Sequence, residues 1–439
     1  MKRGFWGLVL GAFFLSACVQ NPPPSSSPPS QATCTPQATG QSLQAQGVGA
    51  GFQVPRGLGD FSAPHVPGEL LVFAEGFTPQ GLANRVEGVV PLKVFQGGFL
   101  HVRVPPGWER AKAEALLRAG ARWVQPNYIY EPLALPPNDP LYAPYQKPQL
   151  SGLVGLEAAW ANSTGDPDLI LAVVDTGYLP HKDMGSRWYR PQGCLDVADN
   201  DQDPTDDIAS QDRGHGLAVA SVIGAETNNA LGMAGVTWRG KLLPLKVARS
   251  SDGLMSTAYV REAVDLAVQL GAKVINLSLG APGSDPVLEQ SLSAARAQGV
   301  VLVAAAGNDG IDGVLYPASS PSVIAVGSVS NDKSKSYFSN YGPELDLVAP
   351  GERVTVLLPN NGYGFGSGTS FASPIVAGVV ALYMSKYASE RKVWPTPDQV
   401  YQCLTATAED LGPSGRDDEY GFGLVRADRV MADLTHCFP

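Results

Sequence analysis

The C-terminal part of the chain alternates between short apolar runs and longer segments with helical periodicity. Residues 169–174, LILAVV, contain no polar side chain, which is typical of a strand buried on both faces of a sheet. Strands that alternate with helices predict an α/β fold, a doubly wound, mostly parallel sheet with helices on both faces. The expected strands are 169–174, 241–247, 273–279, 300–305 and 323–329, and the expected helices are 216–223, 259–270 and 286–298.

A further segment, residues 366–383, joins a glycine-rich turn (GSGTSFASP) to an apolar run (IVAGVVALY). This pattern predicts a buried helix with Ser370 in its first turn. Free backbone N–H groups point outward there, so a developing oxyanion could be bound beside a nucleophilic hydroxyl. The alternative is that Thr369 or Ser370 only caps the helix, and by itself the segment favours the cap.

The N-terminus has the pattern of a signal peptide, residues 1–17. Lys2 and Arg3 precede an apolar run, residues 4–15, which is too short to span a bilayer as a helix. The sequence LSAC that ends at Cys18 resembles the lipobox of bacterial lipoproteins, which implies lipidation of this cysteine after cleavage. Ordinary signal-peptide cleavage is the alternative, and both interpretations predict export.

Three regions follow the signal peptide. Residues 18–62 are rich in Pro, Ser, Gln and Gly and cannot bury enough apolar surface to fold, so we expect a flexible tether. Residues 63–135 predict a small α+β domain, and prolines between 132 and 148 separate it from the α/β domain, residues 136–439. The small domain is expected to have strands at 69–73, 99–104 and 123–130, one further middle strand, and helices at 78–87 and 108–119.

The composition limits the classes of function. The chain is 44% hydrophobic and 16% charged, which fits a compact globular protein, and its net charge of −10 argues against a nucleic acid or anionic partner. An exported chain can hold disulfides. Cys403 and Cys437 could join the last helices, but three pairings remain open for the four cysteines after Cys18, which are Cys34, Cys194, Cys403 and Cys437.

Four residues with chemical potential lie at expected strand ends or helix starts. Asp175 ends the first buried strand, where a carboxylate is costly unless it is paired. His215 opens a helix, where the dipole disfavours the charged imidazole, so a neighbouring carboxylate is needed. Asn308 follows the strand at 300–305, and Ser370 starts the last helix. An Asp, a His, an Asn and a Ser at one edge of a sheet are the groups that acyl transfer requires.

Residues 139–435 resemble the subtilisin-like serine proteases in the motifs that contain these four residues. The resemblance implies that Ser370 is the nucleophile, that His215 is the general base and then the acid, and that Asp175 orients the imidazole. It implies an oxyanion hole made by Asn308 and the Ser370 N–H. The family's GHGTHVA motif reads GHGLAVA at 214–220, which we expect to change packing and not chemistry.

The same resemblance predicts a cleft that binds an extended peptide by strand addition. The small residues at 305–307 favour substrates with a large apolar side chain just before the scissile bond. The leading hypothesis is an exported, monomeric serine endopeptidase that acts on polypeptides. An esterase with the same triad and a peptide-binding envelope lipoprotein without activity are the alternatives. The implied substrate-binding residues are Ser278, Leu279, Gly280, Ala305, Ala306 and Gly307.

The small domain, residues 63–135, resembles the inhibitor-type prosegments of these proteases. The resemblance implies an intramolecular chaperone that blocks the cleft with its C-terminal tail until the enzyme cuts itself free, between about residues 130 and 149. The protein would then be made as a zymogen. A permanent accessory domain is the alternative interpretation.

Calcium is the expected cofactor. Asp199, Asp201 and Asp203 belong to an acidic loop before His215, and such carboxylates repel one another unless a cation lies among them. A solvated acidic loop is the alternative. A second calcium site is implied by the resemblance alone, and its ligands would be Asp139, Asp183 and Asn229.

Overall fold

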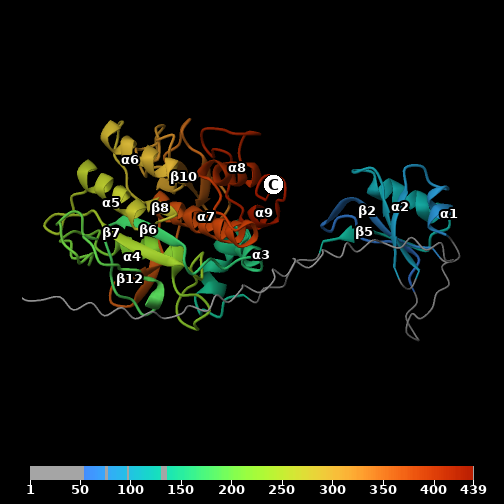
Figure 1. The fold of residues 1–439 in the computed structure, drawn as a ribbon, viewed down its shortest axis with the longest axis horizontal. Helices are drawn as coiled ribbons and strands as arrows, with labels where there is room; N and C mark the ends of the chain where they lie inside the picture. The colour runs from blue at the N-terminus through green and yellow to red at the C-terminus, as the bar shows by residue number, and fades with distance from the viewer. Residues whose placement is uncertain (1–53, 75–77, 96–97, 130–135, 439) are drawn as a thin grey trace, which may run out of the picture. The chain divides into compact units, whose positions relative to one another are not determined.

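The computed structural model describes residues 54–74, 78–95, 98–129 and 136–438. The predicted signal peptide, Cys18, Cys34 and most of the predicted tether lie outside these residues. The chain divides into two compact units, Met1–Tyr130 and Glu131–Pro439, and each is described by itself (Figure 1).

The first unit is a five-stranded sheet in the order β1-β5-β2-β4-β3, with β1 parallel to β5 and the other pairs antiparallel. Alternate residues of β2, among them Leu70 and Val72, are buried in one cluster with Leu116 of α2. The elements are β1 (Gly57–Leu58), β2 (His65–Phe73), α1 (Pro79–Ala83), β3 (Val90–Val94), β4 (Phe99–Arg103), α2 (Glu109–Arg118) and β5 (Trp123–Tyr128).

Two details of this unit differ from the sequence prediction. Strand β1 lies inside residues 18–62, where a tether was expected, because Gly57 and Leu58 pair with Trp123 and Val124 of β5. Helix α1 ends at Ala83 rather than at residue 87. Both differences arise at short segments, whose structure depends on the neighbouring strands more than on local pattern.

The second unit is built on a six-stranded parallel sheet in the order β11-β10-β9-β8-β6-β7. The chain places β7 on one side of β6 and then crosses to β8 on the other side, so the sheet is doubly wound, as predicted. The strands are β6 (Ile170–Asp175), β7 (Lys241–Lys246), β8 (Val274–Leu277), β9 (Val301–Ala305), β10 (Ile324–Val329) and β11 (Leu347–Pro350).

Helices cover both faces of this sheet (Figure 1). Helices α4 (His215–Gly224) and α7 (Thr369–Arg391) pack together on one face, and α5 (Thr257–Gln269) and α6 (Pro286–Ala297) pack together on the other. The remaining elements are η1 (Tyr142–Gln146), η2 (Pro148–Leu153), α3 (Leu156–Trp160), η3 (Gly185–Arg187), the hairpin β12 (Val354–Leu358) and β13 (Gly362–Gly366), α8 (Pro397–Thr407) and α9 (Ala427–Ala432).

Helix α7 is the central helix of the second unit, and it contacts β8, β9, β10 and β11. Among the described residues it alone is long and apolar enough to cross a membrane, but 83% of its most apolar window is buried inside the unit. A helix that is apolar on every side is expected in the core of a large domain. We therefore interpret α7 as a core helix.

A disulfide joins Cys403 of α8 to Cys437 near the C-terminus. The Tyr383 hydroxyl of α7 donates a hydrogen bond to the Cys437 carbonyl over 2.7 Å, so the same region is fixed to the core helix. Cys194 is an exposed free thiol. Cys403–Cys437 is the pair that the sequence analysis suggested could join the last helices.

Candidate active site

An aspartate–histidine pair lies at the carboxyl edge of the parallel sheet. Asp175 is the last residue of β6, and His215 is the first residue of α4. Gly214, with φ of 95°, turns the chain into the helix through a conformation that favours glycine. The distance from His215 Nδ1 to Asp175 Oδ1 is 2.8 Å. The buried carboxylate therefore has the partner that its position requires.

The surroundings of His215 set its protonation. Burial lowers the pKa of the imidazole, but the charge and hydrogen bond of Asp175 outweigh this effect. The charges of Asp212 and Asp206 act in the same direction, and the pKa of His215 lies above its ordinary value. Nearby carboxylates thus offset both burial and the helix dipole.

Ser370 is the second residue of α7, and the structure contradicts the simple cap interpretation. The N-cap position is occupied by Gly368, which has no side chain, and Thr369 and Ser370 lie inside the helix. Within the described chain, Ser370 Oγ donates to the Ser278 carbonyl over 3.4 Å and has no hydrogen bond with His215. The ring of the adjacent Phe371 lies 5.9 Å from the His215 ring, so the start of α7 is beside the imidazole. Hydrogen bonds between a nucleophile and its base are often long until substrate is bound.

A proline in α7 ties the serine to the strand β8. Pro374 has no N–H, so the Ser370 carbonyl loses its helical partner four residues on. The Ser278 hydroxyl donates to this carbonyl instead, over 3.0 Å. Ser278 follows β8 directly, and this contact fixes the first turn of α7 against the carboxyl edge of the sheet.

Asn308 follows β9 and is oriented by Thr369. The amide oxygen of Asn308 accepts from the Thr369 N–H at 2.8 Å and from the Thr369 hydroxyl at 2.9 Å. Two donors on the oxygen assign the free Nδ2 group as the available donor. Asn308 is exposed, and Gly368 approaches it closely, since a Cβ at that glycine would lie 3.5 Å from Nδ2.

The loop behind Asn308 is held by a second asparagine. Asn340 is fully buried, and its side chain accepts from the Asp309 N–H at 2.8 Å and donates to the Gly313 carbonyl at 3.0 Å. Its own N–H donates to the Gly307 carbonyl over 3.0 Å. The oxyanion candidate therefore stands on a loop with satisfied backbone groups.

The predicted cleft segments lie side by side because β8 and β9 are neighbouring parallel strands. Residues 278–280 follow the end of β8, and residues 305–307 complete and follow β9. Gly280 is exposed and Leu279 is half-buried, whereas Ala305, Ala306 and Gly307 are buried. Both segments reach the edge of the sheet at which Asp175 ends β6.

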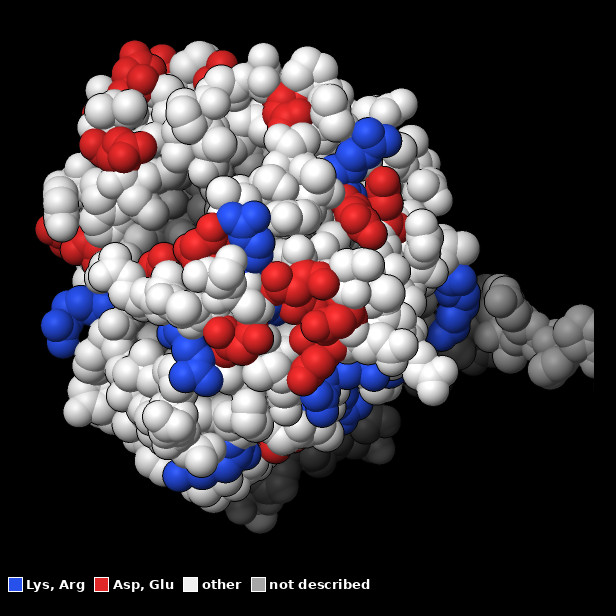
Figure 2. Space-filling model, turned by 90° about the vertical axis from the view of Figure 1, so that its left-hand side faces the viewer, with Lys and Arg blue, Asp and Glu red and all other residues white. Residues whose placement is uncertain are grey.

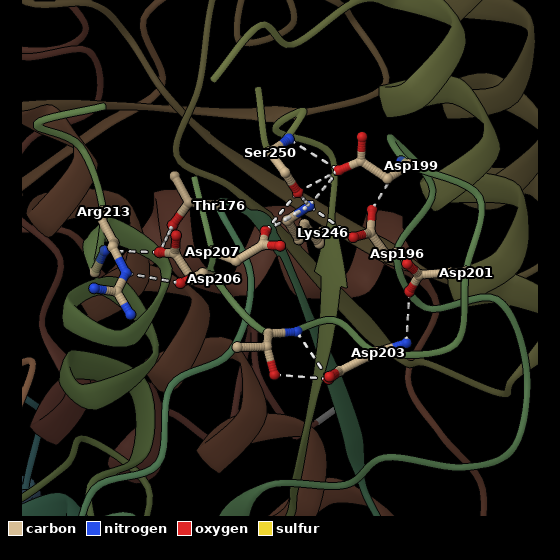
Figure 3. Close-up of polar contacts among 12 residues, drawn as sticks. Thr176, Asp196, Asp199, Asp201, Asp203, Asp206, Asp207, Arg213, Lys246 and Ser250 are labelled. Carbon is tan, nitrogen blue, oxygen red and sulfur yellow. Dashed lines mark hydrogen bonds and ion pairs between the residues drawn. The ribbon is translucent and has the colours of Figure 1, made fainter. Parts of the chain in front are cut away.

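A lysine pairs with part of the acidic loop before His215. Lys246, the last residue of β7, is fully buried, and its Nζ lies 2.6 Å from Asp196, 2.7 Å from Asp199 and 3.3 Å from Asp207 (Figure 3). Burial lowers the pKa of this ammonium group, but the hydrogen bonds and charges of the aspartates raise it above its ordinary value. Figure 2 shows acidic and basic side chains next to each other on the surface that is on the left in Figure 1.

This network corrects the argument for calcium at the acidic loop. Asp199 is bonded to Lys246, Asp201 accepts from the Asp203 N–H, and Asp203 accepts from Thr205, so the three predicted ligands do not converge. No group of three or more His, Cys, Asp or Glu residues in the described chain could hold a metal ion. Lys246 is a cation that lies among Asp196, Asp199 and Asp207, so the need for a cation is no longer an argument for a metal at this loop.

The second set of predicted metal ligands is brought together. Asp183 accepts from Asn229 Nδ2 at 2.9 Å and from the Met233 N–H at 2.8 Å. Asp139 accepts from the N–H groups of Asn228 and Asn229. Both carboxylates are buried, and burial raises the pKa of each. The charge of Asp139 raises the pKa of Asp183 further, so the two groups destabilise each other as anions.

A buried carboxylate on a histidine, a serine at a helix start and a free amide donor define the site of a serine hydrolase on an α/β sheet. Comparison with known proteins agrees. The Subtilase family model matches residues 166–423. The thermophilic serine proteinase of Bacillus sp. (strain AK1) is 36% identical over 301 residues, which cover 68% of this chain and 70% of the relative.

Two further relatives extend the likeness. The halolysin-like extracellular serine protease Nep of Natrialba magadii is 35% identical over 345 residues, 76% of this chain and 60% of that protein. A protease from Pseudoalteromonas arctica PAMC 21717 has a solved structure with a TM-score of 0.58 and 28% identity, covering 67% of this chain and 98% of that one. The chain belongs to the subtilase family and is a serine endopeptidase.

Sequence reasoning missed three supports of this site. Thr369 was considered only as a cap, although its N–H and hydroxyl orient Asn308. Asp206 was not predicted to contact the site, although it accepts from Thr176 and from the Gly214 N–H. Lys246 gave no signal of its own, because its partners lie far away in the sequence.

The buried lysine leads to a stability prediction. Lys246→Met leaves Asp196 buried without its counter-charge, so we expect the free energy of unfolding to fall by about 3–5 kcal/mol. Urea titration of the inhibited enzyme measures this loss. The control is Lys241→Met, whose exposed pair with Asp168 contributes at most about 1 kcal/mol. Equal effects of the two substitutions would contradict the account.

Proposed function

We propose that Ser370, His215 and Asp175 form the catalytic triad of this endopeptidase and that Asn308 is the oxyanion donor. The observation that carries the proposal is the 2.8 Å hydrogen bond from His215 Nδ1 to the buried Asp175 carboxylate. It leaves Nε2 as the basic nitrogen of the imidazole. The position of Ser370 at the start of α7, beside His215, supports its role as the nucleophile.

The reaction uses each group in turn. His215 Nε2 takes the proton from Ser370 Oγ as that oxygen attacks the scissile carbonyl carbon. The oxyanion that forms accepts hydrogen bonds from Asn308 Nδ2 and the Ser370 N–H, and Asp175 stabilises the imidazolium. His215 then gives the proton to the leaving amine, and an acyl-enzyme remains on Ser370. Water, deprotonated by His215, hydrolyses the acyl-enzyme and restores the serine.

The cleft suits an extended polypeptide. The segments 278–280 and 305–307 lie at neighbouring strand ends, an arrangement that supports binding of substrate by strand addition. The small side chains of residues 305–307 favour a substrate with a large apolar side chain before the cut. An extended cleft favours peptides over simple esters as substrates of this triad.

The first unit acts as a prosegment that is removed by self-cleavage. Its separate sheet and its core support a domain that folds by itself. The residues from Asp139 onward are packed into the second unit, since Asp139, Tyr142 and Gln146 are buried. Cleavage within this packed segment would require local unfolding, so we place the cut before Asp139. This choice narrows the predicted interval of residues 130–149.

The enzyme is exported. The segment with a signal-peptide pattern supports this proposal, as does the disulfide between Cys403 and Cys437, which is typical of proteins from oxidising compartments. The relative from Natrialba magadii is named as extracellular. Lipidation of Cys18 would hold the precursor at the cell envelope, and self-cleavage before Asp139 would then release the catalytic unit.

Calcium binds at Asp139, Asp183 and Asn229. Two buried carboxylates are hard oxygen ligands that suit the ion. Asn229 donates from Nδ2 to Asp183, and its Oδ1 accepts from the Leu231 N–H, so the amide would have to turn to present its oxygen to the ion. A bound divalent cation would remove the repulsion between the two carboxylates. The role of the ion is stability of the folded enzyme and not a step in the reaction.

Substitution of the nucleophile and of the oxyanion donor tests the triad. Ser370→Ala should abolish both peptide hydrolysis and self-cleavage, so that the full-length precursor accumulates. Asn308→Ala should keep KM within about twofold and lower kcat by about 10²–10³-fold, the loss that removal of such a donor causes in subtilisin. Peptide hydrolysis and intact mass measure these effects.

The control for both substitutions is Ser367→Ala, three residues before the nucleophile, whose hydroxyl accepts from the Arg353 N–H. This variant should mature and cleave peptide normally. A Ser370→Ala protein that still matures in a pure preparation, or that still cleaves peptide, would overturn the assignment.

The raised pKa of His215 predicts the acid limit of activity. The imidazole must be neutral to accept the Ser370 proton, and a raised pKa keeps it protonated to higher pH. We therefore expect kcat/KM to fall as pH drops through a value above about 6.5, the ordinary pKa of histidine. Asp212→Asn removes one of the charges that raise the pKa and should move this limit to lower pH. Activity that peaks in acid would contradict the role of His215.

Removal of calcium tests the metal proposal. An ion present at 100 times its Kd stabilises the folded state by about 2.7 kcal/mol, so a chelator should lower the Tm of the mature enzyme. Asp139→Asn and Asp183→Asn should abolish this response. The matched control Asp203→Asn, in the acidic loop, should retain it. A Tm that does not change with chelator would show that the site holds no calcium.

A further inference from the structure

Asp206 joins the two loops that carry the aspartate–histidine pair. Its carboxylate is fully buried, and Oδ2 accepts from the Thr176 hydroxyl at 2.6 Å and from the Gly214 N–H at 2.7 Å (Figure 3). Thr176 follows Asp175, and Gly214 precedes His215. One oxygen atom therefore bridges the residues next to both members of the pair.

A second hydrogen bond closes the same bridge. The Thr176 hydroxyl, which donates to Asp206, also accepts from the Gly216 N–H at 2.9 Å. The residues on both sides of His215 are thus fixed to Thr176 and Asp206. The fit is tight, since a Cβ at Gly216 would lie 2.4 Å from the Gly177 carbonyl oxygen. A small movement of either loop would change the distance between Asp175 and His215.

Asp206 is itself held in place from several directions. Its N–H donates to the Tyr178 carbonyl at 2.8 Å, and Arg213 Nε donates to its carbonyl at 3.0 Å.

We propose that Asp206 is a positioning residue, which holds Asp175 and His215 in register through Thr176 and Gly214. This inference rests on the triad assignment of the proposed function. A buried carboxylate is unfavourable for folding unless its hydrogen bonds compensate, and here both of the bonds to Oδ2 come from the loops of the catalytic pair.

The charge of Asp206 also acts on His215. The charges of three carboxylates raise the pKa of the imidazole: Asp175 from β6, and Asp212 and Asp206 from the preceding loop. Phe371 of α7 lies on another side of the ring. The Arg213 guanidinium donates to the Asp206 carbonyl. Loss of the Asp206 charge would therefore make the imidazolium less stable and shift its titration to lower pH.

Two substitutions at Asp206 separate position from charge. Asp206→Ala removes the acceptor, and we expect kcat to fall by about 10–100-fold with KM changed less than twofold, because small displacements of catalytic groups have effects of this size. Asp206→Asn keeps an acceptor for Thr176 and Gly214 and should restore kcat to within about threefold of wild type. Its kcat/KM should lose activity at a lower pH than wild type.

Asp207→Asn is the matched control. This neighbour loses the same charge, but its carboxylate is 59% exposed and contacts Lys246 and Ser250 instead of the catalytic loops. We expect a normal kcat and an unchanged acid limit. Variants that do not mature by themselves are processed with a trace of tagged wild-type enzyme, which is then removed, and their Tm values are recorded.

The outcomes decide between the possibilities. An Asp206→Ala enzyme with a lowered Tm but wild-type kcat and pH profile would make Asp206 merely structural and overturn the inference. Equal losses of kcat in Asp206→Ala and Asp206→Asn, with no shift of the acid limit, would also overturn it. An active Ser370→Ala enzyme would instead refute the proposed triad. Failure of the inference and failure of the function are therefore distinguishable.

Discussion

The hydrogen bond between His215 and Asp175 is the constraint on which the site depends. It requires β6 to end and α4 to begin at the same edge of the parallel sheet. The buried carboxylate is acceptable there only because it is paired, and the imidazole at the start of a helix retains a raised pKa only because carboxylates surround it. The pairing of His215 with Asp175 therefore links the position of the imidazole to its protonation.

The start of α7 brings Ser370, the proposed nucleophile, to this pair, and Ser370 does not cap the helix. Gly368 enters the helix, Thr369 turns toward Asn308, and the hydroxyl of Ser370 remains beside the cleft. Pro374 releases the Ser370 carbonyl, which Ser278 then binds. Gly368, Thr369 and Pro374 thus have distinct structural roles. The helix start supplies both the N–H and the hydroxyl of Ser370.

The sheet was predicted correctly from the sequence, and the four candidate site residues could be located, because both signals are local. Continuous apolar runs identify buried strands, and Asp175, His215, Asn308 and Ser370 follow or open elements that local pattern defines. The role of Lys246 was not predictable in the same way, because its partners lie 39 to 50 residues away in the sequence. Strand β1 was missed since two residues carry no periodicity.

The most direct measurement of the central claim is a crystal structure of the mature enzyme after reaction with a peptidyl phosphonate. The account predicts a covalent bond from Ser370 Oγ to phosphorus. It also predicts a phosphonyl oxygen about 2.7–3.1 Å from both Asn308 Nδ2 and the Ser370 N–H, with His215 still bonded to Asp175. A label on another residue, or a phosphonyl oxygen directed away from Asn308, would contradict it.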